Sequence, residues 1–366
     1  MQYCLHAGQL CAKGVKELNS NSCPHFNINE FDREEITIKS LHEGHKGFYS
    51  LNVRWIDLKV EEENKINLEE EAGPSTKKVK GNENEVFHAL IDKSHCAILK
   101  KSKKTISAMD EIYILEKFSK DINSTKIIYL YGYEEFQNSM YILLEYGGPN
   151  LLDYFNEIVI GEGSEGNNSL LTEEQEIFLT KIIIEASETI EEFHQFGGIH
   201  MDIKPQNFVV TEELKVKLID FGISLLKEDE DFLENVKRMY FKRGNKIYLK
   251  GGNNNIGTTN YIAPEIEFNK NGVEITDRVD IYSFGVMIFK LRHKWNVQFY
   301  QNELEHFKEQ LQFNCIKPLE RVMRACFQLD KENRPAIHSI SKFLKGDCDH
   351  FYYERQFKNK KWRKLC

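Results

Sequence analysis

Two short stretches of the sequence combine carboxylates, an amide and a lysine at close spacing. The first is His200-Met-Asp-Ile-Lys-Pro-Gln-Asn207, and Asp220-Phe-Gly222 follows it closely. Phosphoryl transfer needs a carboxylate to orient the attacking hydroxyl, a cation to neutralise developing charge and oxygen ligands for magnesium. Either stretch alone is a common chance match, since a lone aspartate beside an apolar run is more often a turn or a cap. Together, around a predicted hairpin, they indicate catalysis.

The elements that must position these residues are predicted from periodicity and turn signals. Residues 172–196 predict a helix, because a capping box opens the segment and apolar residues recur at spacings of three and four. A pair of glycines then ends it. The apolar runs 208–210 and 216–219 around a short turn predict a hairpin. Residues 279–291 are apolar almost all round, which is typical of a helix buried at the centre of a helical lobe.

These motifs resemble those of the eukaryotic protein kinases, whose catalytic loop H-x-D-x-K-x-x-N is followed by D-F-G. The resemblance implies that Asp202 orients the substrate hydroxyl and accepts its proton, and that Lys204 contacts the γ-phosphate of ATP. Asn207 and Asp220 would then hold Mg2+ through oxygen ligands. The resemblance also implies an α+β, two-lobed fold, with a small lobe of antiparallel sheet and a larger helical lobe.

Later stretches extend the resemblance toward the carboxyl terminus. The run Gly257-Thr-Thr-Asn-Tyr-Ile-Ala-Pro-Glu265 matches the end of a kinase activation segment and places Thr258 and Glu265 in it. Asp280 matches the start of the central buried helix, and Arg334 matches a late arginine that pairs with Glu265. The resemblance implies a buried bidentate pair, a geometry that arginine suits better than lysine. Taken alone, each of the two residues reads equally well as a surface charge.

The small lobe is predicted from a strand and a helix. Ala97-Ile-Leu-Lys100 resembles the family strand whose lysine contacts the α- and β-phosphates of ATP. Its alternative is a lysine on an edge strand, because three more lysines follow closely. Glu111 would pair with Lys100 from the next helix, and Glu116 is the alternative partner.

The nucleotide contacts depart most from the family pattern. Where the family has Gly-x-Gly-x-x-Gly, residues 79–86 keep only the middle glycine and add two glutamates, which predicts weakened ATP affinity. The stretch Met140–Gly147 resembles the strand and hinge that hold adenine, a ring that needs a flat apolar slot and backbone hydrogen-bonding groups. The predicted nucleotide-contacting residues, besides Lys100 and Glu111, are Gly81, Val86, Leu144, Glu145, Tyr146 and Gly147.

The motifs also indicate a subfamily. A lysine two residues after Asp202 is the serine/threonine pattern, and Met201 stands where most kinases have arginine. With the run 257–261, these features are similar to the monopolar-spindle kinases, dual-specificity enzymes of the spindle checkpoint and kinetochore. That similarity implies protein substrates, with kinetochore or checkpoint proteins as candidate partners. The insert 225–255, which holds Tyr240 and Tyr248, makes the activation segment longer than in that family.

Composition and charge runs predict the domain organisation. Residues 61–76 read as a solvated acidic linker. They follow an N-terminal extension, 1–60, in which patches of alternating apolar and polar residues suggest strands but no residues suggest catalysis. The kinase domain is predicted at 77–346, divided into 77–147 and 148–346, with a basic tail at 347–366.

The net charge of −8, from 49 basic and 57 acidic residues, argues against nucleic acid and anionic membranes as partners. No secretory leader is apparent, so an intracellular location, in cytoplasm or nucleus and at the kinetochore or spindle by resemblance, is expected with reduced cysteines. Cysteines and histidines before residue 26 leave a zinc site open, although their spacings match no standard finger. Two rival functions are a pseudokinase scaffold and a small-molecule kinase of the aminoglycoside type. The thinned glycine loop favours the scaffold, but the intact catalytic residues of the two motifs and Lys100 oppose it. The run 257–265 and Arg334 argue against the small-molecule kinase.

Overall fold

The computed structural model describes ten stretches of the chain and, for residues 36–57, the backbone only. The stretches are 36–44, 47–57, 84–91, 95–121, 124–160, 171–235, 240–250, 256–268, 272–293 and 317–356. The chain forms two compact units, the first from residues up to 121 with 128–148, and the second from 122–127 with 149 onward. Each unit is described by itself below.

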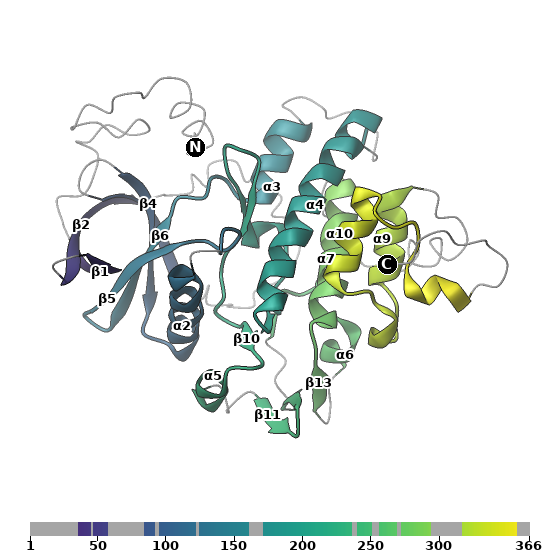
Figure 1. The fold of residues 1–366 in the computed structure, drawn as a ribbon. Helices are drawn as coiled ribbons and strands as arrows, with labels where there is room; N and C mark the ends of the chain where they lie inside the picture. The colour runs from purple at the N-terminus through teal and green to yellow at the C-terminus, as the bar shows by residue number, and fades with distance from the viewer. Residues whose placement is uncertain are drawn as a thin grey trace, which may run out of the picture. The chain divides into compact units, whose positions relative to one another are not determined.

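The described part of the first unit is a closed antiparallel barrel with a helix, α2 (Ile106–Lys120), beside it (Figure 1). In barrel order the strands are β1 (Ile36–Gly44), β2 (Gly47–Asp57), β3 (Asn84–Ile91), β4 (His95–Lys103), β6 (Ser139–Glu145) and β5 (Leu130–Phe136). Its hydrophobic core contains Phe87, Ala89, Ile91, Ala97, Leu99 and Leu143. The helix begins at an N-cap, Thr105, whose side chain accepts a hydrogen bond from the backbone N–H of Ala108.

The register of β3, β4 and β6 sorts their side chains onto two faces. Lys100 of β4 lies between Val86 on β3 and Ile142 on β6. Two residues earlier on β4, Ile98 lies between His88 on β3 and Leu144 on β6. Because side chains alternate along a strand, these residues share one face and the core residues occupy the other. The predicted nucleotide contacts Val86, Lys100 and Leu144 therefore lie on one face of the sheet.

The strands β1 and β2 lie within the predicted N-terminal extension, 1–60, yet they belong to this barrel. β2 pairs with β3, and β1 closes the barrel against β5. The sheet of the first unit therefore begins before residue 77, the start predicted from motifs. The predicted linker, 61–76, lies in the connection between two paired strands and outside the described residues. The remaining domain boundaries stay predictions.

The second unit is mainly helical. Its helices are α3 (Leu151–Tyr154), the π-helical turn η2 (Phe155–Ile160), α4 (Glu173–Gln195), α5 (Glu230–Asn235), α6 (Pro264–Glu267), α7 (Arg278–Arg292), α9 (Pro318–Cys326) and α10 (Ile337–Lys345), with 3₁₀ turns η3 (Pro205–Asn207), η5 (Lys331–Asn333) and η6 (Tyr352–Gln356). Helix α4 packs against α7 and α10, and α7 packs against α9 (Figure 1). The predicted capping box at Thr172 and Gln175 is present.

Helix α7 is the buried centre that the sequence predicts, with every side chain from Val279 to Arg292 buried. Its approach to α9 depends on Gly285. A Cβ at that position would lie 2.5 Å from the Cβ of Cys326 and 3.0 Å from the ring of Phe327. Since real Cβ atoms do not approach so closely, a larger residue would push the two helices apart.

The described residues of the second unit also form three small antiparallel sheets. β7 (Gly198–Ile199) pairs with β10 (Leu225–Leu226), and β8 (Phe208–Val210) pairs with β9 (Val216–Leu218), which confirms the predicted hairpin. The third sheet has the order β11 (Tyr240–Arg243), β12 (Lys246–Leu249), β13 (Val273–Ile275).

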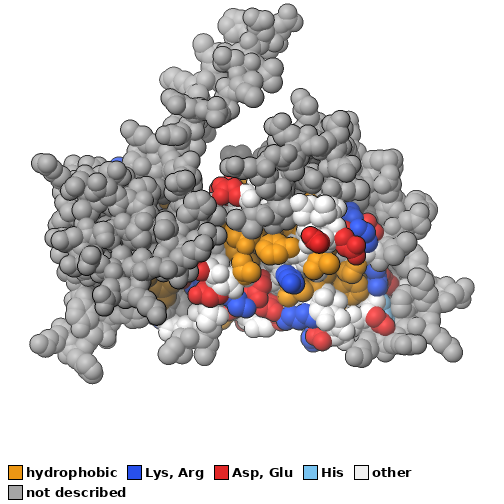
Figure 2. Space-filling view, turned by 90° about the horizontal axis from the view of Figure 1, so that it is seen from above, with side chains coloured by type: hydrophobic (Ala, Val, Ile, Leu, Met, Phe, Trp, Pro, Cys, Tyr) orange, Lys and Arg blue, Asp and Glu red, His pale blue; other side chains and the backbone are white. Residues whose placement is uncertain are grey.

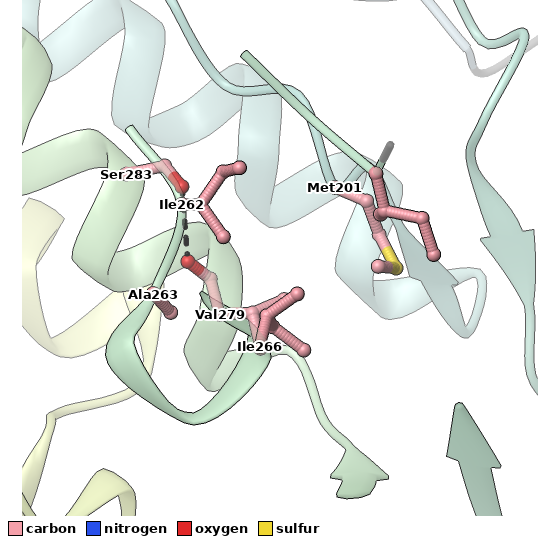
Figure 3. A pocket seen from close by; sticks show the side chains of 7 residues that line it. Met201, Ile262, Ala263, Ile266, Val279 and Ser283 are labelled. Atoms are coloured by element: carbon pink, nitrogen blue, oxygen red, sulfur yellow. Dashed lines mark hydrogen bonds between the residues drawn. The ribbon is translucent and has the colours of Figure 1, made fainter. Parts of the chain in front are cut away.

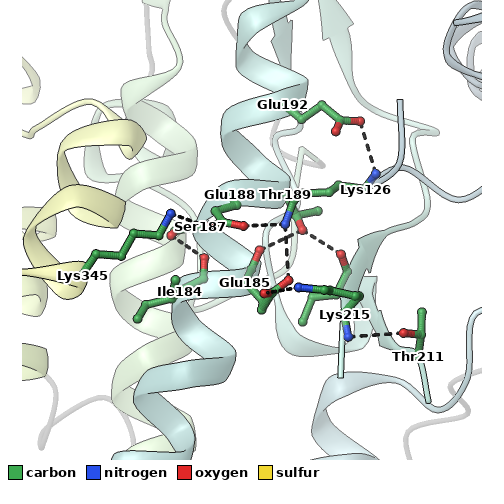
Figure 4. Close-up of polar contacts among 11 residues, drawn as sticks. Lys126, Ile184, Glu185, Ser187, Glu188, Thr189, Glu192, Thr211, Lys215 and Lys345 are labelled. Carbon is green, nitrogen blue, oxygen red and sulfur yellow. Dashed lines mark hydrogen bonds and ion pairs between the residues drawn. The ribbon is translucent and has the colours of Figure 1, made fainter. Parts of the chain in front are cut away.

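A network of ion pairs fixes the outer side of α4 (Figure 4). Lys126 contacts Glu188 at 2.6 Å and Glu185 at 3.3 Å, while Lys215 contacts Glu185 at 2.9 Å. Lys345 of α10 also pairs with Glu188. Burial opposes ionisation of Glu188, but hydrogen bonds from Lys126 and Lys345 hold its pKa below the usual value. The network links residue 126, the β8–β9 hairpin and α10 to α4.

No helix among the described residues is long and apolar enough to cross a membrane. On the face shown in Figure 2, acidic and basic side chains of the described residues border hydrophobic ones. The described stretches contain no group of three or more His, Cys, Asp or Glu side chains suited to a metal, and the cysteines and histidines before residue 26 lie outside them. Cys96 and Cys326 are free thiols, as expected, whereas Cys348 is disulfide-bonded, because sequence spacing does not show which thiols folding brings together.

Candidate active site

Three donors converge on the carboxylate of Asp202, in the loop that follows β7. Lys204 Nζ lies 2.7 Å and Asn207 Nδ2 lies 3.0 Å from Oδ2, and the hydroxyl of Thr258 donates to Oδ1 at 2.6 Å. A carboxylate offers about four acceptor positions. Oδ1 receives one of these donors and Oδ2 receives two, so the remaining acceptor position is on Oδ1. Asp202 is 12% exposed, which leaves that position within reach of a small polar group.

Thr258 also accepts a hydrogen bond from Lys204 Nζ at 2.8 Å. Asp202, Lys204 and Thr258 therefore form a closed triangle of hydrogen bonds. Sequence analysis assigned Thr258 to the activation segment but did not predict this contact, because the two segments are far apart along the chain. The triangle holds the segment after β12 against the loop that carries Asp202.

Asp280, at the start of α7, holds the backbone of this loop through hydrogen bonds. The fully buried Asp280 carboxylate accepts hydrogen bonds from the backbone N–H groups of His200 and Met201, each at 2.8 Å. His194 Nε2, at the end of α4, lies 2.8 Å from the same carboxylate. The structural role predicted for Asp280 thus has a geometric basis. Sequence analysis missed His194, whose position in the last turn of α4 was the available signal.

Aromatic packing fixes the two motifs relative to each other. The ring of Phe221 is fully buried and lies 5.4 Å from that of His200 and 5.1 Å from that of Phe193. His200 Nδ1 accepts from the backbone N–H of Asp202 at 3.3 Å, and His200 Nε2 lies 3.1 Å from the carbonyl oxygen of Ile219. This pattern places the ring proton on Nε2, where it can be donated to that carbonyl.

Asn207 and Asp220, the predicted metal ligands, lie on adjacent backbone segments. The N–H of Ile219 donates to the carbonyl oxygen of Asn207 at 3.0 Å. The amide nitrogen of Asn207 donates to the carbonyl oxygen of Asp202 at 2.8 Å, so its side-chain oxygen is the group left to accept or ligate. Asp220 adopts a left-handed backbone conformation, with φ of 65°. This conformation is unfavourable for residues other than glycine, and such backbone strain is often found at functional sites.

In the first unit, Lys100 and Glu111 form a bidentate pair. Lys100 Nζ lies 2.8 Å from both carboxylate oxygens, and the side chains are 12% and 3% exposed. Glu116, the alternative partner, instead lies 3.7 Å from Lys120 on the outer side of α2. Lys101 points to the opposite face and pairs with the exposed Glu85. The geometry therefore selects Glu111, one turn earlier on the helix.

The other predicted nucleotide contacts are also placed by the barrel. Val86 is 44% exposed although it is an apolar strand residue, and Leu144 lies on the same face. Glu145 ends β6, and the ring of Tyr146 lies 6.0 Å from that of His88. Gly147 is buried. Gly81 lies outside the described residues.

Glu265 and Arg334 meet within the second unit as predicted. Arg334 Nη1 lies 2.6 Å from Oε1 and Nη2 lies 2.9 Å from Oε2 of Glu265, and the arginine side chain is fully buried. Arg334 also donates to the carbonyl oxygens of Gln328 and Arg278, at 2.9 and 3.1 Å. Its guanidinium lies 5.2 Å from the ring centroid of Tyr282. The end of the activation segment is therefore tied to α7 and the turn before α10.

A second anchor of this segment lies one turn earlier. Ser283 of α7 donates to the carbonyl oxygen of Tyr261 at 2.7 Å, and Lys290 Nζ lies 3.9 Å from the centroid of the Tyr261 ring. Burial lowers the pKa of Lys290 to about 8. Helix α7 thus holds Tyr261 directly, while Arg334, from the turn before α10, holds Glu265.

The sequence that builds this geometry matches the model of a known family. The model of the protein kinase domain matches residues 79–346, which is most of the chain. The chain belongs to the protein kinase domain family. The α+β, two-lobed class predicted from the motifs is confirmed, and the two units correspond to the small and large lobes of the kinase.

Curated relatives cover only parts of this kinase. It is 28% identical to the dual specificity protein kinase shkC of Dictyostelium discoideum over 40% of the chain and 27% of the relative. It is 26% identical to the mouse dual specificity protein kinase TTK, a relative in the predicted monopolar-spindle family, over 58% and 23%. A probable inactive serine/threonine-protein kinase of D. discoideum is 25% identical over 52% and 16%. The chain therefore spans about a quarter or less of the length of these relatives.

The donor set of the kinase fits ATP and a divalent metal. Asn207 and Asp220 would supply hard oxygen ligands, and a divalent ion held mainly by phosphates and water needs only one or two from the protein. When bound, ATP supplies the phosphoryl group and the metal offsets charge on its oxygens. In the predicted mechanism, Asp202 Oδ1 would receive the proton of the attacking hydroxyl, and Lys204, which lies beside it, would be the cation available to the transferred group. Lys100, fixed by Glu111, is the cation of the small lobe.

Lys100→Met is expected to lower kcat/KM by roughly 100-fold or more, whereas Lys101→Met should stay within about twofold of wild type. The reason is that Lys100 is held on the nucleotide-facing side by Glu111, while Lys101 pairs with an exposed glutamate on the other side. Steady-state rates at varied ATP concentration measure both effects, with Lys101→Met as the matched control. An inactive Lys101→Met beside an active Lys100→Met would mean that the predicted nucleotide-facing register is wrong by one residue.

Proposed function

We propose that this kinase transfers the γ-phosphoryl group of Mg2+-bound ATP to serine or threonine hydroxyls of protein substrates. The observation that carries the proposal is the triangle of Asp202, Lys204 and Thr258, with one acceptor position left on Asp202 Oδ1. Lys204 is the lysine of the serine/threonine pattern. A free carboxylate oxygen beside a lysine suits an alcohol that must lose its proton to a base and attack a phosphoryl group.

A dual specificity and a role in spindle-checkpoint signalling belong to the same proposal. They are supported by the similarity to the mouse dual specificity protein kinase TTK and by the catalytic-loop and activation-segment motifs. On this proposal the kinase acts inside the cell, in cytoplasm or nucleus, and its partners include kinetochore or checkpoint proteins.

The test is a phosphoacceptor comparison with the purified kinase. Three sets of peptides, identical except for a single serine, threonine or tyrosine, are incubated with Mg2+-ATP, and the product is identified by mass. We expect phosphate on serine and threonine, and on tyrosine as well if the enzyme has dual specificity. Transfer to tyrosine alone would contradict the serine/threonine assignment.

The second candidate is a pseudokinase scaffold. Residues 79–86 lack two of the three loop glycines, and one relative is named as an inactive kinase. Against it, Lys100, Asp202, Asn207 and Asp220 are all present, and the donors around Asp202 are assembled. A shift of the unfolding temperature by Mg2+-ATP together with no transfer to any peptide would favour the scaffold.

A further inference from the structure

The described part of the insert in the activation segment forms β10, α5, β11 and β12, and it contacts the loop that carries Asp202. Tyr240, the first residue of β11, is 4% exposed, and its hydroxyl donates to the sulfur of Met201 at 3.6 Å. Met201 is 7% exposed and directly precedes Asp202. A residue of the insert is thus buried against the neighbour of the catalytic aspartate.

Met201 occupies a backbone position that needs support. Its φ is 66°, in the left-handed region that is unfavourable for a residue with a side chain. The N–H of Met201 is held by Asp280, and its carbonyl oxygen is closely covered, since a Cβ at Gly257 would lie 2.9 Å from it. With its backbone held in this way, the part of Met201 that is still able to move is its side chain. Tyr240 is the polar contact that the side chain makes.

The walls around the Met201 side chain are apolar apart from Ser283. It lines a cavity of about 10 Å3, room for one water at most, together with residues of the activation segment and α7 (Figure 3). These lining residues are Ile256, Ile262, Ala263, Ile266, Val279 and Ser283. Because so little space remains, a loss of the Tyr240 ring would open a void that the Met201 side chain could move into.

The sheet that carries Tyr240 is fixed at its other edge. Ile247 of β12 pairs with Ile275 of β13, and both are 4% exposed. Lys246 and Lys331 each contact the carboxylate of Glu274 across this edge, at 3.1 and 3.3 Å. Since β13 leads directly into α7, the three paired strands connect Tyr240 to the helix that carries Asp280.

We propose that Tyr240 is a positioning residue: through Met201, the β11–β12–β13 sheet fixes the backbone at residues 200–202 and so aims the carboxylate of Asp202. This inference rests on the proposed kinase activity. Misplacing a reacting group by about 1 Å can cost on the order of 100-fold in rate, so a contact one residue from Asp202 is able to control turnover.

The test compares three variants in full-length protein. Tyr240→Ala should lower kcat by roughly 10- to 100-fold with the KM for ATP unchanged, because Asp202 moves while the nucleotide contacts stay. Tyr240→Phe, which keeps the ring and loses only the hydroxyl, should lower kcat by about two- to tenfold. The matched control is Phe241→Ala, next on the same strand but 41% exposed and stacked on Tyr248, which should stay within about twofold of wild type.

Amide hydrogen exchange separates this inference from the proposed activity. Exchange in a peptide covering residues 199–203 should be faster in Tyr240→Ala than in wild type and unchanged in Phe241→Ala, whether or not the wild type transfers phosphate. Unchanged exchange in Tyr240→Ala would overturn the inference, as would a kcat within about twofold of wild type in an active enzyme. If Tyr240→Ala does not fold, Tyr240→Phe decides: an unchanged kcat with unchanged exchange overturns the inference, and a lowered kcat with unchanged KM for ATP supports it.

Discussion

Asp202→Asn is expected to lower kcat by on the order of 10²- to 10⁴-fold and to leave ATP affinity near that of wild type. The amide keeps the size of the carboxylate but cannot accept a proton from the substrate hydroxyl. It also places an NH2 group beside either Thr258 or the pair of donors from Lys204 and Asn207. The loss should therefore appear in kcat, since the nucleotide-facing residues of the small lobe are unchanged.

Peptide phosphorylation rates and ATP titration, measured on the same preparation, check this expectation. Asp347→Asn, at an exposed position after α10, is the matched control and should behave like wild type. A kcat for Asp202→Asn within about tenfold of wild type would exclude Asp202 as the proton acceptor.

Removing either member of the Glu265–Arg334 pair should lower the free energy of unfolding by about 3–5 kcal/mol. Arg334 is fully buried and makes a bidentate contact, so Glu265→Ala leaves a guanidinium without its counter-ion. Arg334→Ala conversely strands the carboxylate and frees two backbone carbonyls. A loss of this size is a large part of the stability of an ordinary domain, so both single variants should also express poorly.

The double variant decides whether the effect comes from the pair. Once one charge is gone, removing the other relieves the stranded group, so the double loss should be well below the sum of the single losses. Denaturant unfolding of the three variants measures this coupling. Lys104→Ala serves as the control, because Lys104 and Glu135 form an exposed pair that should be worth about 1 kcal/mol or less. Additive losses within about 0.5 kcal/mol would show that Glu265 and Arg334 do not interact in solution.

The residues of the catalytic loop could be predicted from the sequence because their spacing is local. Asp202, Lys204 and Asn207 lie within one loop, and local spacing determines which side chains can meet. The same holds for α4, whose capping box and apolar stripe are contained in the helix itself. The partner of Lys100 is harder to predict from the sequence, because pairing between a strand and a helix depends on how the two pack. The alternative partner, Glu116, lies little more than one helical turn beyond Glu111 on α2.

Contacts between distant segments could not be predicted in this way. The alternation in residues 36–57 indicates strands but carries no register, so the pairing of β2 with β3 could not be read from it. The contact of Thr258 with Asp202 and that of His194 with Asp280 each join segments whose separation is set only by the folded lobe. The insert 225–255 reads as charged and glycine-rich, yet Tyr240, Ile247 and Leu249 are buried in it.

The central claim, that the chain is a working protein kinase, is tested most directly by phosphoryl transfer from labelled ATP. Wild-type protein is incubated with ATP labelled at the γ position, a mixed protein substrate and Mg2+, and label on protein is compared with a sample containing chelator. We predict label on serine and threonine that requires the metal and is absent with Asp202→Asn. Binding of Mg2+-ATP without any transfer by the wild type would contradict the account and identify the chain as a nucleotide-binding scaffold.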